Sequence, residues 1–168
     1  FNDHHRKCQY STLFTNAELP RTIAARTTRG ATDPFNVYLN YIYGMLYGEV
    51  WRSVVRAGLD PYFGLMHGSE RDHGSLVFDI IEEFRAPMAD RFVLGLLGRG
   101  FIPDVAADGR LSGRSRHVLV RGFLRHWHKK MSWRSKDVSP AEILDLQVAA
   151  LVRSFQGDGA YRPFKMRW

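Results

Sequence analysis

The chain has 168 residues and a mass of 19.3 kDa, which is long enough to bury a core without disulfides, and its single cysteine, Cys8, cannot form an internal bridge. No apolar run approaches the roughly 20 residues that a membrane span requires, and 45% hydrophobic with 24% charged residues is typical of a globular protein. These features exclude a disulfide framework and a membrane protein. We expect a cytoplasmic, one-domain chain, and the start at Phe1 rather than Met leads us to expect a fragment of a longer protein.

Positive charge is concentrated in one segment. The net charge is +7, and residues 110–134 hold eight Lys or Arg residues and no acid, whereas the other 16 basic residues are balanced by 17 acids. Histidines and tryptophans interleave this strip. A nearly neutral body with one basic strip is typical of a protein that binds a polyanion such as nucleic acid. The alternative is a solvated helix face that is basic without a partner.

In chain order, residues 1–32 are polar and irregular, and we expect an arm or linker there. Asp33 followed by Pro34 predicts a helix start, with Asp33 as the N-cap. This helix should run to about Ala57, stop at Gly58 and be mostly buried, because its apolar face is broad. A turn at 58–61, a short apolar stretch at 62–67 and a polar loop at 68–75 should follow.

Four further elements follow from periodicity and capping signals. Ser75 should cap a helix over 76–84, and Pro87 should restart a helix that reaches about Leu97. The basic segment predicts a helix over about 115–131. The capping box that begins at Ser139 predicts a last helix to about Phe155. No alternating segment is long enough for a sheet, so the predicted fold class is all-α, a multi-helix domain over 33–168.

A pair of acids suggests metal chemistry. Asp79 and Glu82 are three residues apart on one predicted helix, so both carboxylates project from one face, and His67 closes the apolar stretch just before it. Such a set could hold Mg²⁺ or Mn²⁺, which would polarise a phosphodiester and activate a hydroxyl. The alternative is an ordinary amphipathic helix with solvated acids.

Several segments resemble one family in order. They are DPFN at 33–36, LNYIY at 39–43, LYGEV at 46–50, GLDP at 58–61, GLMH at 64–67, SLVFDIIEEFR at 75–85 and YRPFKMRW at 161–168. Together they resemble the C-terminal helical domain of the CRISPR-associated integrase, CRISPR-associated protein one, over residues 33–168.

The resemblance implies a metal-dependent DNA endonuclease and integrase that inserts prespacer DNA into a CRISPR array by transesterification. It implies His67 and Glu82 as metal ligands, with Asp79 as a supporting or alternative ligand. It also implies a homodimer bound to CRISPR-associated protein two, and an N-terminal β-rich domain, which we expect to be absent from this sequence. We expect DNA contacts from Arg121, Arg125 and Lys129, which recur along one face of the basic helix.

One family feature is missing. The upstream glutamate ligand usually lies in a Glu-Gly-x-Ala-Ala type of segment, which this sequence does not contain, and Asp3 is the nearest equivalent carboxylate. We therefore expect the chain alone to be poorly active. Two alternatives stay open: a catalytically inactive DNA-binding or assembly module, and a transposon-encoded integrase of the same fold.

Overall fold

The computed structural model describes residues 30–64, 74–101 and 104–166. They form α2 (Pro34–Arg56), α3 (Ser75–Phe84), a π-helical segment η1 (Arg85–Asp90), α4 (Arg91–Leu97), α5 (Gly113–His128), strands β1 (Met131–Trp133) and β2 (Lys136–Val138), and α6 (Pro140–Phe155). The expected arm, residues 1–32, lies almost entirely outside the described residues.

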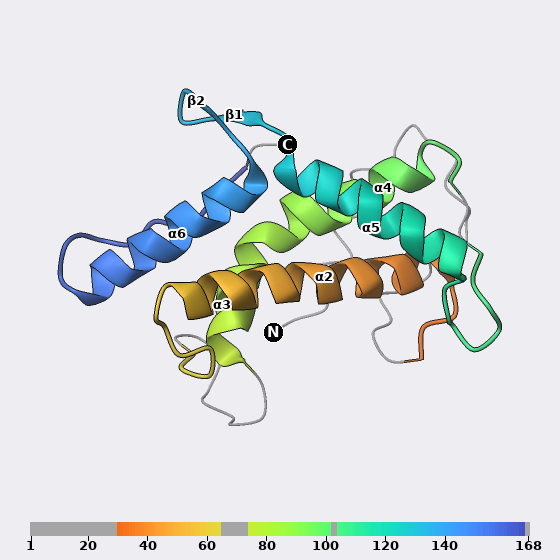
Figure 1. Cartoon of the computed structure of the whole chain (residues 1–168), viewed down its shortest axis with the longest axis horizontal. Coiled ribbons are helices and arrows are strands. Elements are labelled where there is room, and N and C mark those ends of the chain that lie inside the picture. Colours follow the sequence, from red (N-terminus) through yellow and green to blue (C-terminus); the bar gives the residue numbers. More distant parts are fainter. Residues whose placement is uncertain (1–29, 65–73, 102–103, 167–168) are drawn as a thin grey trace, which may run out of the picture.

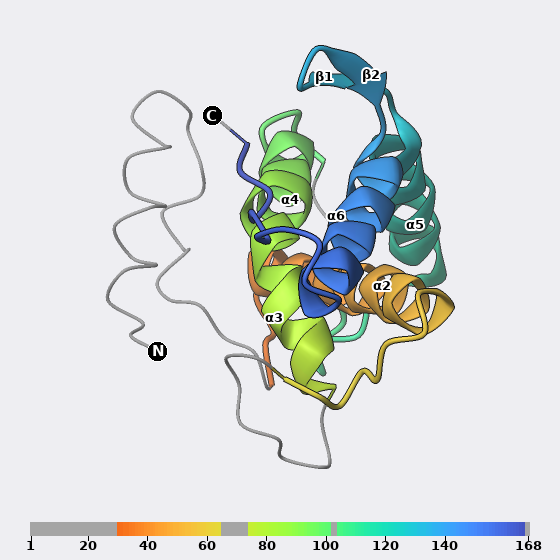
Figure 2. The same cartoon turned by 90° about the vertical axis from the view of Figure 1, so that its left-hand side faces the viewer.

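The central helix is α2, which contacts α3, η1, α4, α5 and α6 (Figure 1). Viewed from the side, α3 and α4 lie on one side of the molecule and α5 and α6 on the other (Figure 2). Mostly helical secondary structure with a single two-stranded sheet among the described residues confirms the all-α prediction. No helix in this described part is long and apolar enough to cross a membrane.

Helix α2 begins and ends as its sequence predicts. The Asp33 carboxylate accepts hydrogen bonds from the backbone N–H of Asn36 at 2.9 Å and from its side-chain amide at 2.9 Å, which satisfies a free donor of the first turn. The helix stops before Gly58, which has a φ of 75°. Most of its apolar residues are buried, as predicted, although Val55 near its end is 51% exposed.

The predicted restart at Pro87 is wrong. Helix α3 continues directly into η1, which contains Pro87, and then into α4. Proline lacks the N–H that an α-helix needs, and a wide π-helical turn accommodates that loss without ending the helix.

The start of α3 also differs slightly from the prediction, because Gly74 rather than Ser75 is the N-cap residue. A Cβ on Gly74 would come within 2.8 Å of the Trp51 ring, so this close approach requires glycine.

The basic helix α5 starts at a Ser112 cap and ends at His128, earlier than predicted. Lys129 therefore lies just past the helix in extended conformation, not on the predicted helical face. The chain then forms an antiparallel hairpin in which Met131 pairs with Val138 and Trp133 with Lys136. The expectation of no strands is wrong here, because strands of three residues are too short to show an alternation.

The last helix and the segment after it complete the core. The capping box of α6 is confirmed: the Ser139 N–H donates to the Glu142 carboxylate at 2.6 Å, and the Glu142 N–H donates to the Ser139 hydroxyl at 3.3 Å. Phe164, beyond the helix, is only 3% exposed and stacks on Phe84 with ring centres 5.0 Å apart. The segment after α6 therefore packs on the core through Tyr161, Phe164 and Met166, with Phe164 against the end of α3, while the residues between them stay exposed.

Candidate metal centre and nucleic-acid interface

Helix α3 carries the two predicted acids, and they differ in environment. Asp79 is buried, with 6% of its surface exposed, whereas the Glu82 side chain is 43% exposed. They are three residues apart on one helix, so they share a face. Glu82 is therefore the acid that solvent or a ligand can reach, and Asp79 is largely shielded from solvent.

Glu82 is held by a cation. Its carboxylate forms an ion pair with Arg85, which is one turn further along. The Arg85 guanidinium also lies 4.4 Å from the centre of the Tyr43 ring of α2. The Tyr43 hydroxyl in turn donates to the Asp90 carboxylate at 2.5 Å. The orientation of Glu82 is thus determined by contacts that reach α2 and η1, and the sequence alone gave no signal for this arrangement.

The neighbouring acid, Glu83, has a structural role. It accepts hydrogen bonds from the Tyr161 hydroxyl, from the Gln147 side-chain amide at 3.1 Å and from the Phe164 N–H at 2.7 Å. Burial, together with the hydrogen bond to Glu83, raises the pKa of Tyr161 well above its usual value. Glu83 therefore binds residues 161–164 to α3, and only Glu82 of this glutamate pair remains suited to an external ligand.

The structure describes two of the four metal ligands that the sequence predicts, Asp79 and Glu82. His67 and Asp3 lie outside the described residues, and within the described ranges no group of three or more His, Cys, Asp or Glu side chains is arranged to hold a metal ion. Asp79 and Glu82 supply hard oxygen donors from one helix face, the donor type that Mg²⁺ and Mn²⁺ take. These two residues fit such an ion as part of a site, which needs further ligands from elsewhere in the protein.

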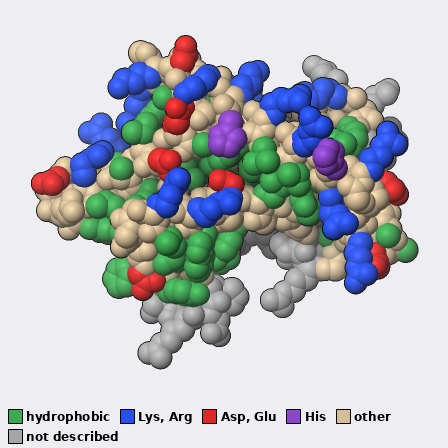
Figure 3. Space-filling model, viewed as in Figure 1, with side chains coloured by type: hydrophobic (Ala, Val, Ile, Leu, Met, Phe, Trp, Pro, Cys, Tyr) green, Lys and Arg blue, Asp and Glu red, His purple; other side chains and the backbone are tan. Residues whose placement is uncertain are grey.

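The predicted cationic surface follows α5. Arg121 and Arg125 are exposed on the helix, and Lys129 is exposed just past its end. Figure 3 shows Lys and Arg side chains gathered over this part of the molecule. Lys130 is largely neutralised by Glu142, with its amine 2.6 Å from the carboxylate. The two arginines and Lys129 therefore keep their charge available for a polyanion.

One histidine of the strip does not belong to this surface. Burial lowers the pKa of His126 below its usual value of 6.5, and the nearby cations Arg91, Lys129 and Arg99 lower it further. Its Nε2 atom is buried and has no hydrogen-bond partner among the described residues. His126 is thus a neutral packing residue beside Phe92, with ring centres 5.6 Å apart.

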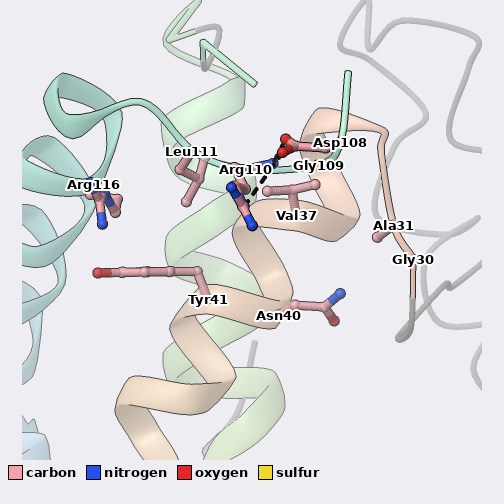
Figure 4. A pocket seen from close by; sticks show the side chains of 10 residues that line it. All are labelled: Gly30, Ala31, Val37, Asn40, Tyr41, Asp108, Gly109, Arg110, Leu111 and Arg116. Carbon is pink, nitrogen blue, oxygen red and sulfur yellow. Dashed lines mark hydrogen bonds and ion pairs between the residues drawn. The ribbon is translucent and has the colours of Figure 1, made fainter. Parts of the chain in front are cut away.

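A pocket of about 650 Å³ lies at the other end of α2, between its first turns and the 108–111 loop (Figure 4). Among the described residues that line it, Asp108 is the one carboxylate, and it pairs with Arg110 at 3.4 Å. Gly109 allows this loop to pass close to Ala31, because a Cβ there would lie 2.3 Å from the Ala31 carbonyl oxygen. This pocket lacks the paired acids of α3 and is not the candidate metal centre.

Comparisons with known proteins agree with this picture. The family profile described as "CRISPR associated protein Cas1" matches residues 9–127. A relative described as "CRISPR-associated endonuclease Cas1 1" from Archaeoglobus fulgidus is 31% identical over 153 residues, which is 88% of this chain and 44% of the relative. The chain spans less than half the length of this relative and of the similar proteins from Korarchaeum cryptofilum and Thermus thermophilus, at 36% and 48%.

Two solved structures share the fold. A CAS1 protein from Thermotoga maritima has a TM-score of 0.83 at 21% identity, covering 94% of this chain and 52% of that chain. A chain of a structure titled "Cas6-RT-Cas1--Cas2 complex" has a TM-score of 0.71 at 25% identity, covering 86% of this chain and 17% of that chain. The family match over most of the sequence and this agreement in fold confirm the predicted resemblance: the chain belongs to the CRISPR-associated protein Cas1 family.

Proposed function

We propose that residues 33–168 are the catalytic helical domain of a Cas1 endonuclease and integrase that inserts prespacer DNA into a CRISPR array. The observation that carries this proposal is the exposed carboxylate of Glu82, held by Arg85 on the same helix face as Asp79. Family membership and the cationic α5 surface support it. A metal-binding face and a phosphate-binding face on one small domain suit phosphodiester chemistry.

In this proposal His67, Glu82 and Asp79 hold Mg²⁺ or Mn²⁺, and Asp3 is a further candidate ligand. When bound, the ion polarises the phosphodiester and favours ionisation of the attacking hydroxyl. The prespacer 3′-oxygen forms a bond to phosphorus at the repeat boundary. The bond from phosphorus to the displaced 3′-oxygen breaks, and that oxygen takes up a proton. The number of phosphodiester bonds does not change, so no external energy source is needed.

Arg121, Arg125 and Lys129 bind DNA phosphates of the prespacer and the repeat in this proposal. The active form is a homodimer assembled with a Cas2 protein in the cytoplasm. The choice of Cas2 as the partner is supported by the similar solved structure whose title names a Cas1–Cas2 complex. The single cysteine is compatible with a reducing compartment.

The test uses the full-length protein that contains this chain. We expect Glu82→Gln and His67→Ala each to reduce Mn²⁺-dependent cleavage of branched DNA, and strand transfer into a repeat, by at least about 100-fold, because each removes a donor from the ion. The matched control is Glu49→Gln. Glu49 forms an ion pair with Arg52 at the same three-residue spacing, but on α2, and this variant should keep its activity.

Three outcomes would contradict parts of the proposal. Unchanged metal-dependent cleavage in both variants would remove the ligand assignment. A wild-type protein that binds DNA but never cleaves it with Mn²⁺ or Mg²⁺ would indicate an inactive assembly module. Strand transfer that requires transposon ends, with no use of prespacer-like DNA, would indicate an integrase of mobile elements.

A further inference from the structure

The β1–β2 hairpin has an unusual turn. Trp133 pairs with Lys136, so Arg134 and Ser135 alone make the connection, and both have positive φ, 50° and 62°. A two-residue turn with positive φ at both positions is type I′, which strongly favours Asn-Gly. Arg134 and Ser135 adopt it against a steric preference. The positively charged Arg134 therefore occupies a backbone position that favours asparagine or glycine.

The tip of the hairpin is cationic and exposed. Arg134, Ser135 and Lys136 are all exposed, and the Arg134 guanidinium lies 4.4 Å from the centre of the Trp133 ring. Asp137 is paired with Ser132, so it lies on the opposite face of the hairpin from Lys136. The hairpin follows the end of α5 and lies beyond that helix (Figures 1 and 2), so its exposed cations come directly after the basic helix in the chain.

The turn end of the hairpin is connected to α3 through Trp133, the residue next to Arg134. The Trp133 ring meets the Phe164 ring edge-on, with centres 6.0 Å apart, and Phe164 stacks on Phe84 of α3. The Phe164 N–H donates to Glu83, the residue next to Glu82. Trp133 is thus connected to the helix that carries the candidate ligands by two ring contacts and one charge-assisted hydrogen bond.

We propose that the hairpin is a second contact for the backbone of duplex DNA, held in fixed register with α3 through Trp133 and Phe164. This inference rests on the proposed function. The tip cations bind a phosphate beyond the α5 surface, and the rigid connection determines which phosphodiester reaches Glu82. Cations at an exposed tip, one of them stacked on a ring, suit a polyanionic backbone better than an apolar protein surface.

The first test measures DNA binding, with no dependence on catalysis. The full-length protein carrying Arg134→Ala and Lys136→Ala should show a salt slope, log K against log salt, that is smaller by about 1 to 2, because each lost phosphate contact removes about 0.9. Two controls are matched. Ser135→Gly keeps both cations and relieves the turn, and Arg153→Ala removes an exposed cation on α6. Both should keep the wild-type slope.

An unchanged slope in the double variant overturns the proposal. If the slope is unchanged and binding to the Cas2 partner is lost, the hairpin is a protein-binding surface instead. This binding experiment remains decisive even if the wild-type protein shows no metal-dependent cleavage, an outcome that would refute the proposed function alone.

The second test measures register. Trp133→Ala keeps the tip cations but removes the connection to Phe164, so duplex affinity should stay within about threefold while strand-transfer products spread over neighbouring phosphates. Trp133→Phe retains a ring and should restore a single position. Thermal melting confirms that both variants fold. A single, wild-type insertion position in a folded Trp133→Ala protein overturns the register part of the proposal.

Discussion

The Arg85 guanidinium lies 4.4 Å from the centre of the Tyr43 ring while it pairs with the Glu82 carboxylate. One cation therefore links α2 to the exposed acid of α3. An arginine held over a ring loses little side-chain freedom when it pairs, so it can hold a carboxylate in one orientation. This contact makes Glu82 a better-ordered candidate ligand than an ordinary exposed glutamate.

Replacing Tyr43 should separate the ring contact from the hydrogen bond. Tyr43→Phe removes the hydrogen bond to the buried Asp90 carboxylate but keeps the ring beneath Arg85, so the free energy of unfolding should fall by about 2 kcal/mol. Tyr43→Leu removes both interactions and should cost about 1 kcal/mol more. Urea unfolding of the three proteins measures the difference. Equal stability of the Phe and Leu variants would show that the Arg85–Tyr43 contact contributes nothing.

The two adjacent glutamates should respond differently to the same change. Glu83→Ala removes the acceptor of the Phe164 N–H and of the Tyr161 hydroxyl, while the Gln147 amide keeps its bond to the Arg162 carbonyl. The free energy of unfolding should fall by about 3 kcal/mol, because the lost hydrogen bonds go to a charged group. Glu82→Ala removes only a partly exposed ion pair and should cost less than about 1 kcal/mol. Denaturant titration of both variants checks this. A larger loss from Glu82→Ala would contradict the assigned roles.

His126 should make stability depend on pH. Because its pKa is lower in the folded protein than the unfolded value near 6.5, the unfolded chain binds the proton more readily, and acid favours unfolding. The free energy of unfolding should therefore be highest above about pH 7 and should fall as the pH drops through about 6.5. His126→Leu removes this contribution and should flatten the profile between about pH 7.5 and pH 5.5. The midpoints of urea unfolding of both proteins across that range measure this difference. The same pH dependence in His126→Leu and the wild type would contradict a buried, neutral His126.

The α5 surface should control non-specific DNA affinity. Arg121→Ala and Arg125→Ala should each reduce the salt slope of duplex binding in the full-length protein by about 0.9, and together by about twice that, since separate phosphate contacts add. Lys130→Ala is the matched control within the same strip, because Lys130 already pairs with Glu142. Binding isotherms at several salt concentrations give the slopes. Equal effects of all three substitutions would indicate a general charge effect rather than defined contacts.

The sequence by itself determined the elements that depend on local interactions. The Asp33-Pro34 start of α2, the capping box of α6 and the helical spacing of Asp79 and Glu82 involve residues within one turn of each other, so their signals are written in consecutive residues. The short motifs indicated the family for the same reason. The basic strip at 110–134 could also be predicted, because it is defined by residue types alone and does not depend on what packs against it.

Only the tertiary structure decided which of these residues are available for function. Glu82 and Glu83 are neighbours, and the contacts that separate their roles come from Gln147, Tyr161 and Phe164, which lie 64 to 81 residues further along the chain. The π-helical passage through Pro87 and the hairpin at Arg134 likewise depend on long-range packing that compensates an unfavourable local conformation. Burial of His126 is decided by the elements around it. A helix face becomes core or surface according to its distant partners, and the order of residues within the helix does not specify them.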